Sequence, residues 1–251
     1  MSGSGSHPHT RGLGLTSATS RQRLLDELRA WGVKDERVLK ALERVPRYEF
    51  LDDALKGRAY ENNALPIGLS QTISQPFVVA LMTEAVLSDD AKFAAPLPSS
   101  PRKAGRGDFE RPAAAHAPHR KVQRVLEVGT GSGYQAAVLA EVVPMVYSIE
   151  RLRLLSEQAR TRLRRLGYQN IHFSYGDGMA GWAAHAPYDA IVVTAAAGSV
   201  PQALLDQLAP EGRLVIPVGA PGFQTLRVLN RQGSGRELGG VTFVPLLPGK
   251  A

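Results

Sequence analysis

The chain has 251 residues, a net charge of +7 and no cysteine. This length allows one α/β domain with appendages or two small domains, and it is sufficient to bury a core without disulfides. The absence of cysteine excludes disulfide bonds, thiolate metal sites and a cysteine nucleophile.

The first 20 residues are rich in Gly, Ser and Thr, and we predict a disordered extension over residues 1–20. They lack the apolar core of a signal peptide. No stretch of the chain approaches the roughly 20 apolar residues that a membrane-spanning helix needs. We therefore expect a cytoplasmic protein that has no membrane segment.

Helical periodicity begins at residue 21. Two apolar stripes, one on either side of Gly32, predict two helices. The stripes consist of Leu24, Leu25, Leu28 and Trp31, and of Val38, Leu39, Leu42 and Val45.

Residues 60–74 contain several helix breakers and are predicted to form a loop. A third helix is predicted over residues 75–87, with Pro76 in its first turn, where proline is tolerated. Ser74 directly precedes this helix, so its hydroxyl could cap the helix or serve a binding site, and the two roles are compatible. Residues 21–87 together form a predicted N-terminal helical cap.

Residues 88–122 are predicted to be a disordered basic linker. The stretch 99–124 holds seven basic and two acidic residues, so it contributes +5 of the net charge of +7. It is also rich in Pro, Ala and Gly, which is typical of disordered segments. Because the charge is concentrated in this stretch, we interpret it as a solvated linker, with a nucleic-acid tether as the alternative.

Beyond the linker, residues 123–251 alternate between strand and helix patterns. This alternation predicts right-handed βαβ units and a doubly wound, mostly parallel sheet covered on both faces. The predicted strands lie at residues 124–128, 145–150, 171–175, 188–194 and 213–218, and the predicted helices at residues 134–141, 152–166, 179–184 and 201–208. Two late strands, at residues 225–230 and 240–245, are predicted to form a hairpin at one edge of the sheet.

The first predicted strand runs into the sequence VGTGSGY, in which Gly129, Gly131 and Gly133 alternate with other residues. A strand, a glycine turn and a helix N-terminus together form a cradle for a nucleotide-like ligand. The spacing is G-x-G-x-G rather than the G-x-G-x-x-G of dinucleotide-binding proteins. We therefore predict that the ligand is S-adenosylmethionine rather than a redox cofactor.

Two acidic residues follow later strands of the predicted sheet. Glu150 ends the second strand, where a carboxylate can accept hydrogen bonds from both ribose hydroxyls. Asp177 follows the third strand between two glycines and could hold the adenine edge, although an Asp-Gly turn explains it equally well.

The chain resembles the protein-L-isoaspartate (D-aspartate) O-methyltransferases. The resemblance covers the chain from about residue 21 to its end, apart from the linker. Its matching segments include residues 45–51 (VPRYEFL), 71–76 (QTISQP), 125–134 (VLEVGTGSGY), 188–196 (YDAIVVTAA) and 212–219 (GRLVIPVG). The glycine motif is shared by many methyltransferases, whereas the QTISQP segment is much more specific.

The resemblance implies a class I, Rossmann-like S-adenosylmethionine-dependent methyltransferase fold with N-terminal helices that close over the cofactor. It implies methylation of the free carboxylate of L-isoaspartyl and D-aspartyl residues, which initiates repair through a succinimide. The active-site serine of the family corresponds to Ser74. The family's cofactor contacts correspond to Thr72, Ile73, Ser74, Gly129, Glu150, Asp177 and Gly178. We expect a monomer that acts on isoaspartyl proteins and peptides and does not need nucleic acid.

Two other functions are alternatives at this stage. One is a class I methyltransferase that acts on RNA, held by the basic linker, or on a small molecule. The other is a cofactor-binding protein without catalytic activity, which the presence of Ser74 beside a complete cradle argues against. We predict no metal site, because the paired histidines (His7, His9, His116 and His119) lie in low-complexity segments.

Overall fold

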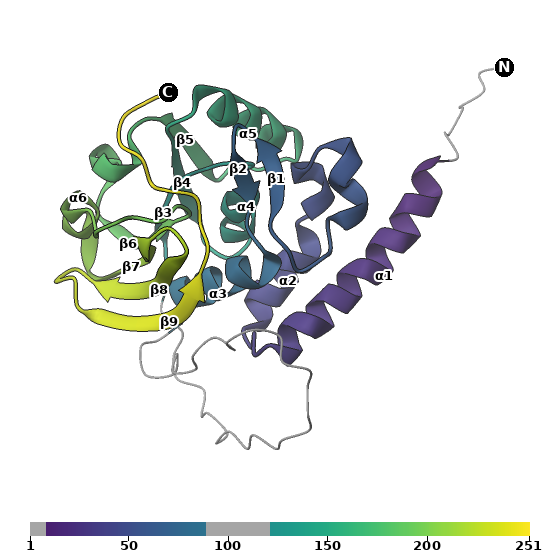
Figure 1. Cartoon of the computed structure of the whole chain (residues 1–251), viewed down its shortest axis with the longest axis horizontal. Coiled ribbons are helices and arrows are strands. Elements are labelled where there is room, and N and C mark those ends of the chain that lie inside the picture. Colours follow the sequence, from purple (N-terminus) through teal and green to yellow (C-terminus); the bar gives the residue numbers. More distant parts are fainter. Residues whose placement is uncertain (1–8, 89–120) are drawn as a thin grey trace, which may run out of the picture.

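The structure, a computed structural model, describes residues 9–88 and 121–251, without the side chains of residues 9–17. The predicted linker at residues 88–122 therefore lies outside the described residues except at its two ends. In the described part of the chain, a central sheet is flanked by helices, and the N-terminal helices pack to one side (Figure 1). No helix within these ranges is both long enough and apolar enough to cross a membrane.

The central sheet has seven strands in the order β5-β4-β3-β6-β7-β8-β9. Neighbouring strands from β5 to β7 are parallel, whereas β8 and β9 are antiparallel strands at one edge. The chain moves outward from β3 to β5 and then returns to the other side of β3, which confirms the predicted doubly wound fold with a late hairpin. The strands are β3 (Arg124–Val128), β4 (Met145–Glu150), β5 (Ile171–Tyr175), β6 (Tyr188–Val193), β7 (Leu208–Ala220), β8 (Phe223–Asn230) and β9 (Gly235–Val241).

Helices cover both faces of this sheet, so its central strands are nearly continuous apolar runs. Successive residues of β3 point to opposite faces. Val125 belongs to a core cluster that it shares with the N-terminal helices, and Leu126 belongs to a second cluster with Leu204 of α6. The helices are α1 (His9–Ala30), α2 (Glu36–Arg44), α3 (Pro76–Leu87), α4 (Tyr134–Ala140), α5 (Arg153–Arg165) and α6 (Gln202–Asp206).

The two predicted N-terminal helices are confirmed as α1 and α2. Gly32 separates them with a φ of 100°, a left-handed conformation that glycine adopts readily. However, α1 begins at His9, so the prediction of a disordered extension over residues 1–20 is wrong for residues 9–20. The apolar stripe used for the prediction indicates only the part of a helix that packs against the core. Once a helix has formed, each further residue adds a backbone hydrogen bond, so the helix can extend beyond that stripe.

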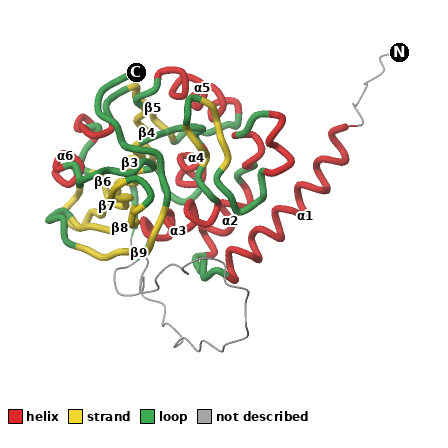
Figure 2. Tube along the Cα trace, viewed as in Figure 1, coloured by secondary structure: helices red, strands yellow, loops and turns green. Residues whose placement is uncertain are grey.

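The predicted loop at residues 60–74 contains a two-stranded antiparallel hairpin of β1 (Leu65–Gly68) and β2 (Gln71–Ile73), drawn in yellow in Figure 2. The prediction missed it because the turn residues, Leu69 and Ser70, adopt positive φ values of 50° and 57° without being Gly or Asn. The hairpin leads directly into α3, which has Pro76 in its first turn as predicted.

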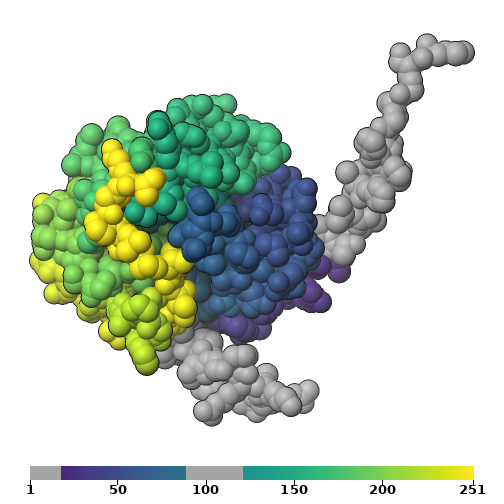
Figure 3. Space-filling model, turned by 45° about the horizontal axis from the view of Figure 1, so that its top comes forward, coloured from purple at the N-terminus to yellow at the C-terminus, as the bar shows by residue number. Residues whose placement is uncertain are grey.

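The third crossover and the chain end also differ from the prediction. The helix predicted at residues 179–184 is replaced by two short 3₁₀ turns, Gly178–Ala180 and Ala183–His185. Strand β9 lies earlier than the predicted strand at residues 240–245. Residues 242–251 instead cross the face of the molecule as an extended segment, visible in yellow in Figure 3.

This C-terminal segment is tied to the ends of the central strands. The amide of Leu246 donates to the carbonyl of Ala196 at 2.7 Å, just beyond β6. Farther along, the amide of Ala251 donates to the carbonyl of Arg151 at 2.8 Å, just beyond β4. The chain end therefore spans the carboxyl edge of the parallel strands, where ligands bind in doubly wound sheets.

Candidate active site

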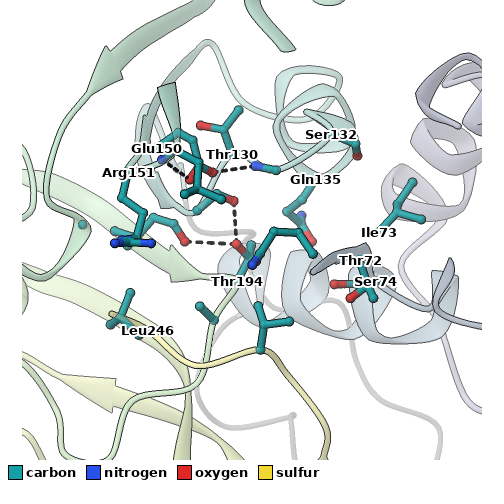
Figure 4. A pocket seen from close by; sticks show the side chains of 18 of the residues that line it. Thr72, Ile73, Ser74, Thr130, Ser132, Gln135, Glu150, Arg151, Thr194 and Leu246 are labelled. Carbon is teal, nitrogen blue, oxygen red and sulfur yellow. Dashed lines mark hydrogen bonds between the residues drawn. The ribbon is translucent and has the colours of Figure 1, made fainter. Parts of the chain in front are cut away.

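A pocket lies at the carboxyl ends of β3, β4 and β6. Its walls come from the glycine loop after β3, the end of β4, the end of β2, and the C-terminal segment. In Figure 4, Thr72, Ile73 and Ser74 lie on one side of this pocket, and Glu150, Arg151 and Leu246 lie on the other. Segments far apart in the sequence therefore build a single site.

Two of the three predicted glycines line the pocket. Gly129 has a φ of 97°, and a Cβ atom at this position would collide with the hydroxyl of Thr194. Gly131 also lines the pocket, whereas Gly133 does not. Gly133 instead precedes α4 with a φ of 89°, and a Cβ atom there would lie 2.8 Å from Leu163 of α5. The absence of a side chain there allows close packing between the loop and α5, and the contact of Gly133 with the cofactor stays a prediction.

Glu150 is buried at the end of β4 and lines the pocket beside the glycine loop. Its Oε2 accepts a hydrogen bond from the amide of Gly131 at 2.9 Å, and its Oε1 accepts one from the amide of Leu152 at 2.9 Å. A carboxylate offers about four acceptor positions, so two remain after these bonds. The carboxylate is therefore held in place and retains the capacity to accept ribose hydroxyls.

The hydroxyl-bearing segment at the end of β2 forms the opposite wall. Thr72, Ile73 and Ser74 all line the pocket. The sequence allowed Ser74 to be the N-cap residue of α3. In the structure the N-cap residue is Gln75, so Ser74 does not cap the helix. The structure thus brings the predicted active-site serine into the same pocket as the predicted cofactor loop.

The third predicted contact region, after β5, is only partly in the pocket. Gly178 lines the pocket, whereas Asp177 is not among the lining residues. The Asp177 carboxylate accepts hydrogen bonds from the amides of Met179 at 2.9 Å and Gly249 at 2.8 Å. It therefore anchors the C-terminal segment, and its contact with the cofactor stays a prediction.

Several lining residues had no site contact assigned to them from the sequence. Thr194 follows β6 and lines the pocket, and its hydroxyl shares its one proton between the carbonyl oxygens of Val128 and Gly129, which helps to fix the glycine loop. Its position at a strand end was a usable signal. The C-terminal residues 244–247 also line the pocket. They reach the site through contacts between residues distant in the sequence, among them the pairing of Pro245 with Ala196.

A buried acidic group lies directly behind the glycine loop. Glu127 of β3 is fully buried and accepts a hydrogen bond from the hydroxyl of Ser148 on β4, which in turn lies 2.6 Å from the hydroxyl of Thr130. Burial raises the pKa of Glu127 from 4.5 to about 8, an increase to which the nearby charge of Glu150 also contributes. The folded protein therefore favours a neutral Glu127 at neutral pH.

Among the residues that the structure describes, no three His, Cys, Asp or Glu side chains gather in an arrangement that could hold a metal ion. The side chains of the four histidines that the sequence singled out lie outside the described residues.

The doubly wound sheet, with its glycine loop after β3 and an acidic side chain at the end of β4, defines a class I S-adenosylmethionine-dependent methyltransferase. The sequence profile of the family described as protein-L-isoaspartate(D-aspartate) O-methyltransferase matches residues 19–92 and 118–251. The chain belongs to this family, and it is an S-adenosylmethionine-dependent protein carboxyl methyltransferase.

Individual relatives agree with this assignment. The protein-L-isoaspartate O-methyltransferase of Halorhodospira halophila is 50% identical over 242 residues, which cover 95% of this chain and 96% of the relative. The protein of the same name from Stenotrophomonas maltophilia is 50% identical over 246 residues, which cover 96% of this chain and 95% of the relative. The predicted family and activity are confirmed.

Solved structures confirm the fold. A protein-L-isoaspartate O-methyltransferase matches with a TM-score of 0.68 and 28% identity, over 90% of this chain and 65% of that chain. A structure from Plasmodium falciparum in complex with S-adenosyl-L-homocysteine matches with a TM-score of 0.67 and 21% identity, over 90% of this chain and 98% of that chain.

The buried Glu127 makes stability depend on pH. The folded protein holds the proton of Glu127 up to about pH 8, whereas the unfolded chain releases it near pH 4.5. The free energy of unfolding should therefore fall as the pH rises through this range, by at most ~1.4 kcal/mol per pH unit. We expect Glu127→Gln to remove this dependence.

Urea denaturation of the wild type and Glu127→Gln at about pH 6 and about pH 9 measures the effect. Glu157→Gln, at an exposed position of α5, is the control and should behave like the wild type. An equal pH dependence in the wild type and Glu127→Gln would show that Glu127 is not neutral in the folded state.

Proposed function

We propose that this chain methylates the free carboxylate of L-isoaspartyl and D-aspartyl residues in damaged polypeptides, and that the transfer takes place in the pocket described above. The observation that carries this proposal is the meeting, in one pocket, of the glycine loop and Glu150 with the hydroxyl-bearing segment 72–74. The relatives that are half identical over nearly the whole chain support the same substrate class.

The cofactor side of the proposal rests on the fit of the residues present. Gly129, Gly131 and Gly178 provide a wall without side chains, and Glu150 offers acceptor positions for ribose hydroxyls. When bound, S-adenosylmethionine supplies an electrophilic methyl group on a sulfonium. The carboxylate of Glu150 is already fixed by two amides, so little of its conformational freedom remains to be lost on binding.

The substrate carboxylate that receives the methyl group needs to be oriented more than it needs to be activated. A carboxylate has a pKa near 4 and is ionised at neutral pH, so no strong general base is required to generate the nucleophile. In the proposed arrangement, the Ser74 hydroxyl donates a hydrogen bond to one carboxylate oxygen and aligns the other with the methyl group. Alignment and the exclusion of water by the pocket walls then lower the barrier.

We also propose a division of the chain into two parts, an oligomeric state and a cellular location. Residues 21–87 form a cap that carries the acceptor segment, and residues 123–251 form the cofactor-binding core. The chain works as a cytoplasmic monomer that does not need nucleic acid.

The substrate proposal is tested with labelled S-adenosylmethionine and a pair of peptides that differ only in an isoaspartyl or a normal aspartyl residue. We expect a base-labile methyl ester on the isoaspartyl peptide alone. Transfer to neither peptide, or to RNA with a steep dependence on salt, would overturn the proposal.

Ser74→Ala should lower kcat for the isoaspartyl peptide by about 10- to 100-fold, the equivalent of a hydrogen bond of ~1.5–3 kcal/mol to a charged group. The dissociation constant of S-adenosylmethionine, measured by calorimetry, should change little. Ser156→Ala in α5, outside the pocket lining, is the control for loss of a serine hydroxyl. Equal losses in kcat and cofactor affinity would argue against an orienting role.

Glu150→Ala should instead weaken the binding of S-adenosylmethionine by about 10- to 100-fold, because it removes a charged acceptor and releases the amide of Gly131. Calorimetric titration measures the dissociation constant, and Glu157→Ala, an exposed glutamate on α5, is the control. Unchanged affinity in Glu150→Ala would remove Glu150 from the cofactor site.

A further inference from the structure

Arg47 is the largest fully buried side chain among the described residues, with 0% of its surface exposed. It opens the 3₁₀ turn Arg47–Phe50, which follows α2. Burial lowers the pKa of Arg47, but a guanidinium remains charged throughout the physiological range. A buried charge is expensive unless hydrogen bonds compensate it, so its partners indicate what the residue does.

The guanidinium joins the two ends of the hairpin segment. Its Nη1 donates to the carbonyl oxygen of Ser74 at 2.8 Å, and its Nη2 donates to the carbonyl oxygen of Asn63 at 3.0 Å. Asn63 precedes β1 and Ser74 follows β2, so one rigid group holds both ends of the segment that carries Thr72 and Ser74. The planar fork of arginine suits this double contact.

The same guanidinium also contacts the cofactor side of the pocket. Its Cζ atom lies 5.0 Å from the ring centroid of Tyr134, the first residue of α4 and a lining residue. Tyr134 meets Phe50 edge to face at 5.3 Å, and Arg162 of α5 lies over Phe50 at 5.9 Å. Such contacts are favourable and depend on geometry.

Arg162 completes this set of contacts at the glycine loop, because its Nη1 donates to the carbonyl oxygen of Ser132 at 2.8 Å. A continuous path of contacts therefore connects Ser74 with the glycine loop through Arg47, Tyr134, Phe50 and Arg162. The acceptor segment and the cofactor loop belong to distant parts of the sequence, and this path links them in space.

We propose that Arg47 is a positioning residue for methyl transfer: it holds Ser74 at a set place relative to the glycine loop. The inference rests on the proposed orienting role of Ser74. Because transfer requires close alignment of the reacting atoms, loss of the Arg47 fork should slow the reaction even when the cofactor binds normally.

The first test compares Arg47→Met and Arg47→Lys with Arg213→Met in the full-length chain. Arg213 is a matched control, since it is also a buried arginine that donates to main-chain carbonyls, those of Ala85 and Ser88 at the far end of α3. Both methionine variants should lower the melting temperature. Only Arg47→Met should lower kcat, by about 10- to 100-fold, while the dissociation constant of S-adenosylmethionine changes by less than about threefold.

Arg47→Lys keeps the buried charge but cannot reproduce the fork, so we expect a folded protein with kcat still reduced about 10-fold or more. If Arg47→Met does not fold, Arg47→Lys alone provides the test. Wild-type kcat in Arg47→Lys, or an equal loss of kcat in the Arg47 and Arg213 variants, would overturn the inference.

The second test is a double-mutant cycle with Ser74→Ala. If Arg47 acts by placing the Ser74 hydroxyl, Arg47→Lys should reduce kcat by less than about threefold once that hydroxyl is absent. If Arg47→Lys lowers kcat by the same factor with and without the Ser74 hydroxyl, the positioning role of Arg47 is overturned and the role of Ser74 stands. An unchanged kcat in Ser74→Ala alone would instead overturn the proposed role of Ser74, and the role of Arg47 with it.

Discussion

The reversal of strand order at β3 is the constraint on which the rest of the structure depends. Because the chain leads from β3 to β4 on one side and from β6 to β7 on the other, the loops after β3 and β6 turn to opposite faces of the sheet and leave a crevice at the carboxyl edge. The site residues at this edge are tied to neighbouring strands by the main chain. The Gly129 amide donates to the Ile149 carbonyl at 2.8 Å, and the Thr194 amide donates to the Val128 carbonyl at 2.9 Å. The site therefore shares the rigidity of the sheet.

Two ionisable side chains are buried near the pocket, and the free-energy cost of burying each of them is offset in a different way. Glu127 shifts its pKa and becomes neutral, since a carboxyl group can take up a proton at moderate cost. Arg47 cannot release its proton in the same way, and it is compensated by main-chain carbonyl oxygens and an aromatic ring. The first group supports the glycine loop from behind, and the second connects the acceptor segment to it.

The C-terminal segment closes the remaining side of the site. Gln224 of β8 holds its start: the amide of Phe243 donates to the Gln224 Oε1 at 2.6 Å, and the Gln224 Nε2 donates to the Phe243 carbonyl at 3.1 Å. Asp177 holds its far part through the amide of Gly249. The walls of one pocket thus come from the N-terminal hairpin, the central strands and the chain end, which meet only in the folded molecule.

The sequence by itself determined the doubly wound core, the cofactor loop and the family. Each of these is encoded locally: apolar runs mark the buried strands, glycines mark the turn with left-handed backbone, and residues 71–76 form one contiguous motif. Tertiary structure alone decided which of these residues share a pocket. It left Gly133 and Asp177 outside the pocket lining, added Thr194 and the chain end to that lining, and showed that Arg47 contacts the main chain of Ser74. Local patterns cannot show such contacts, because they join residues distant in the sequence whose approach depends on how helices and strands pack.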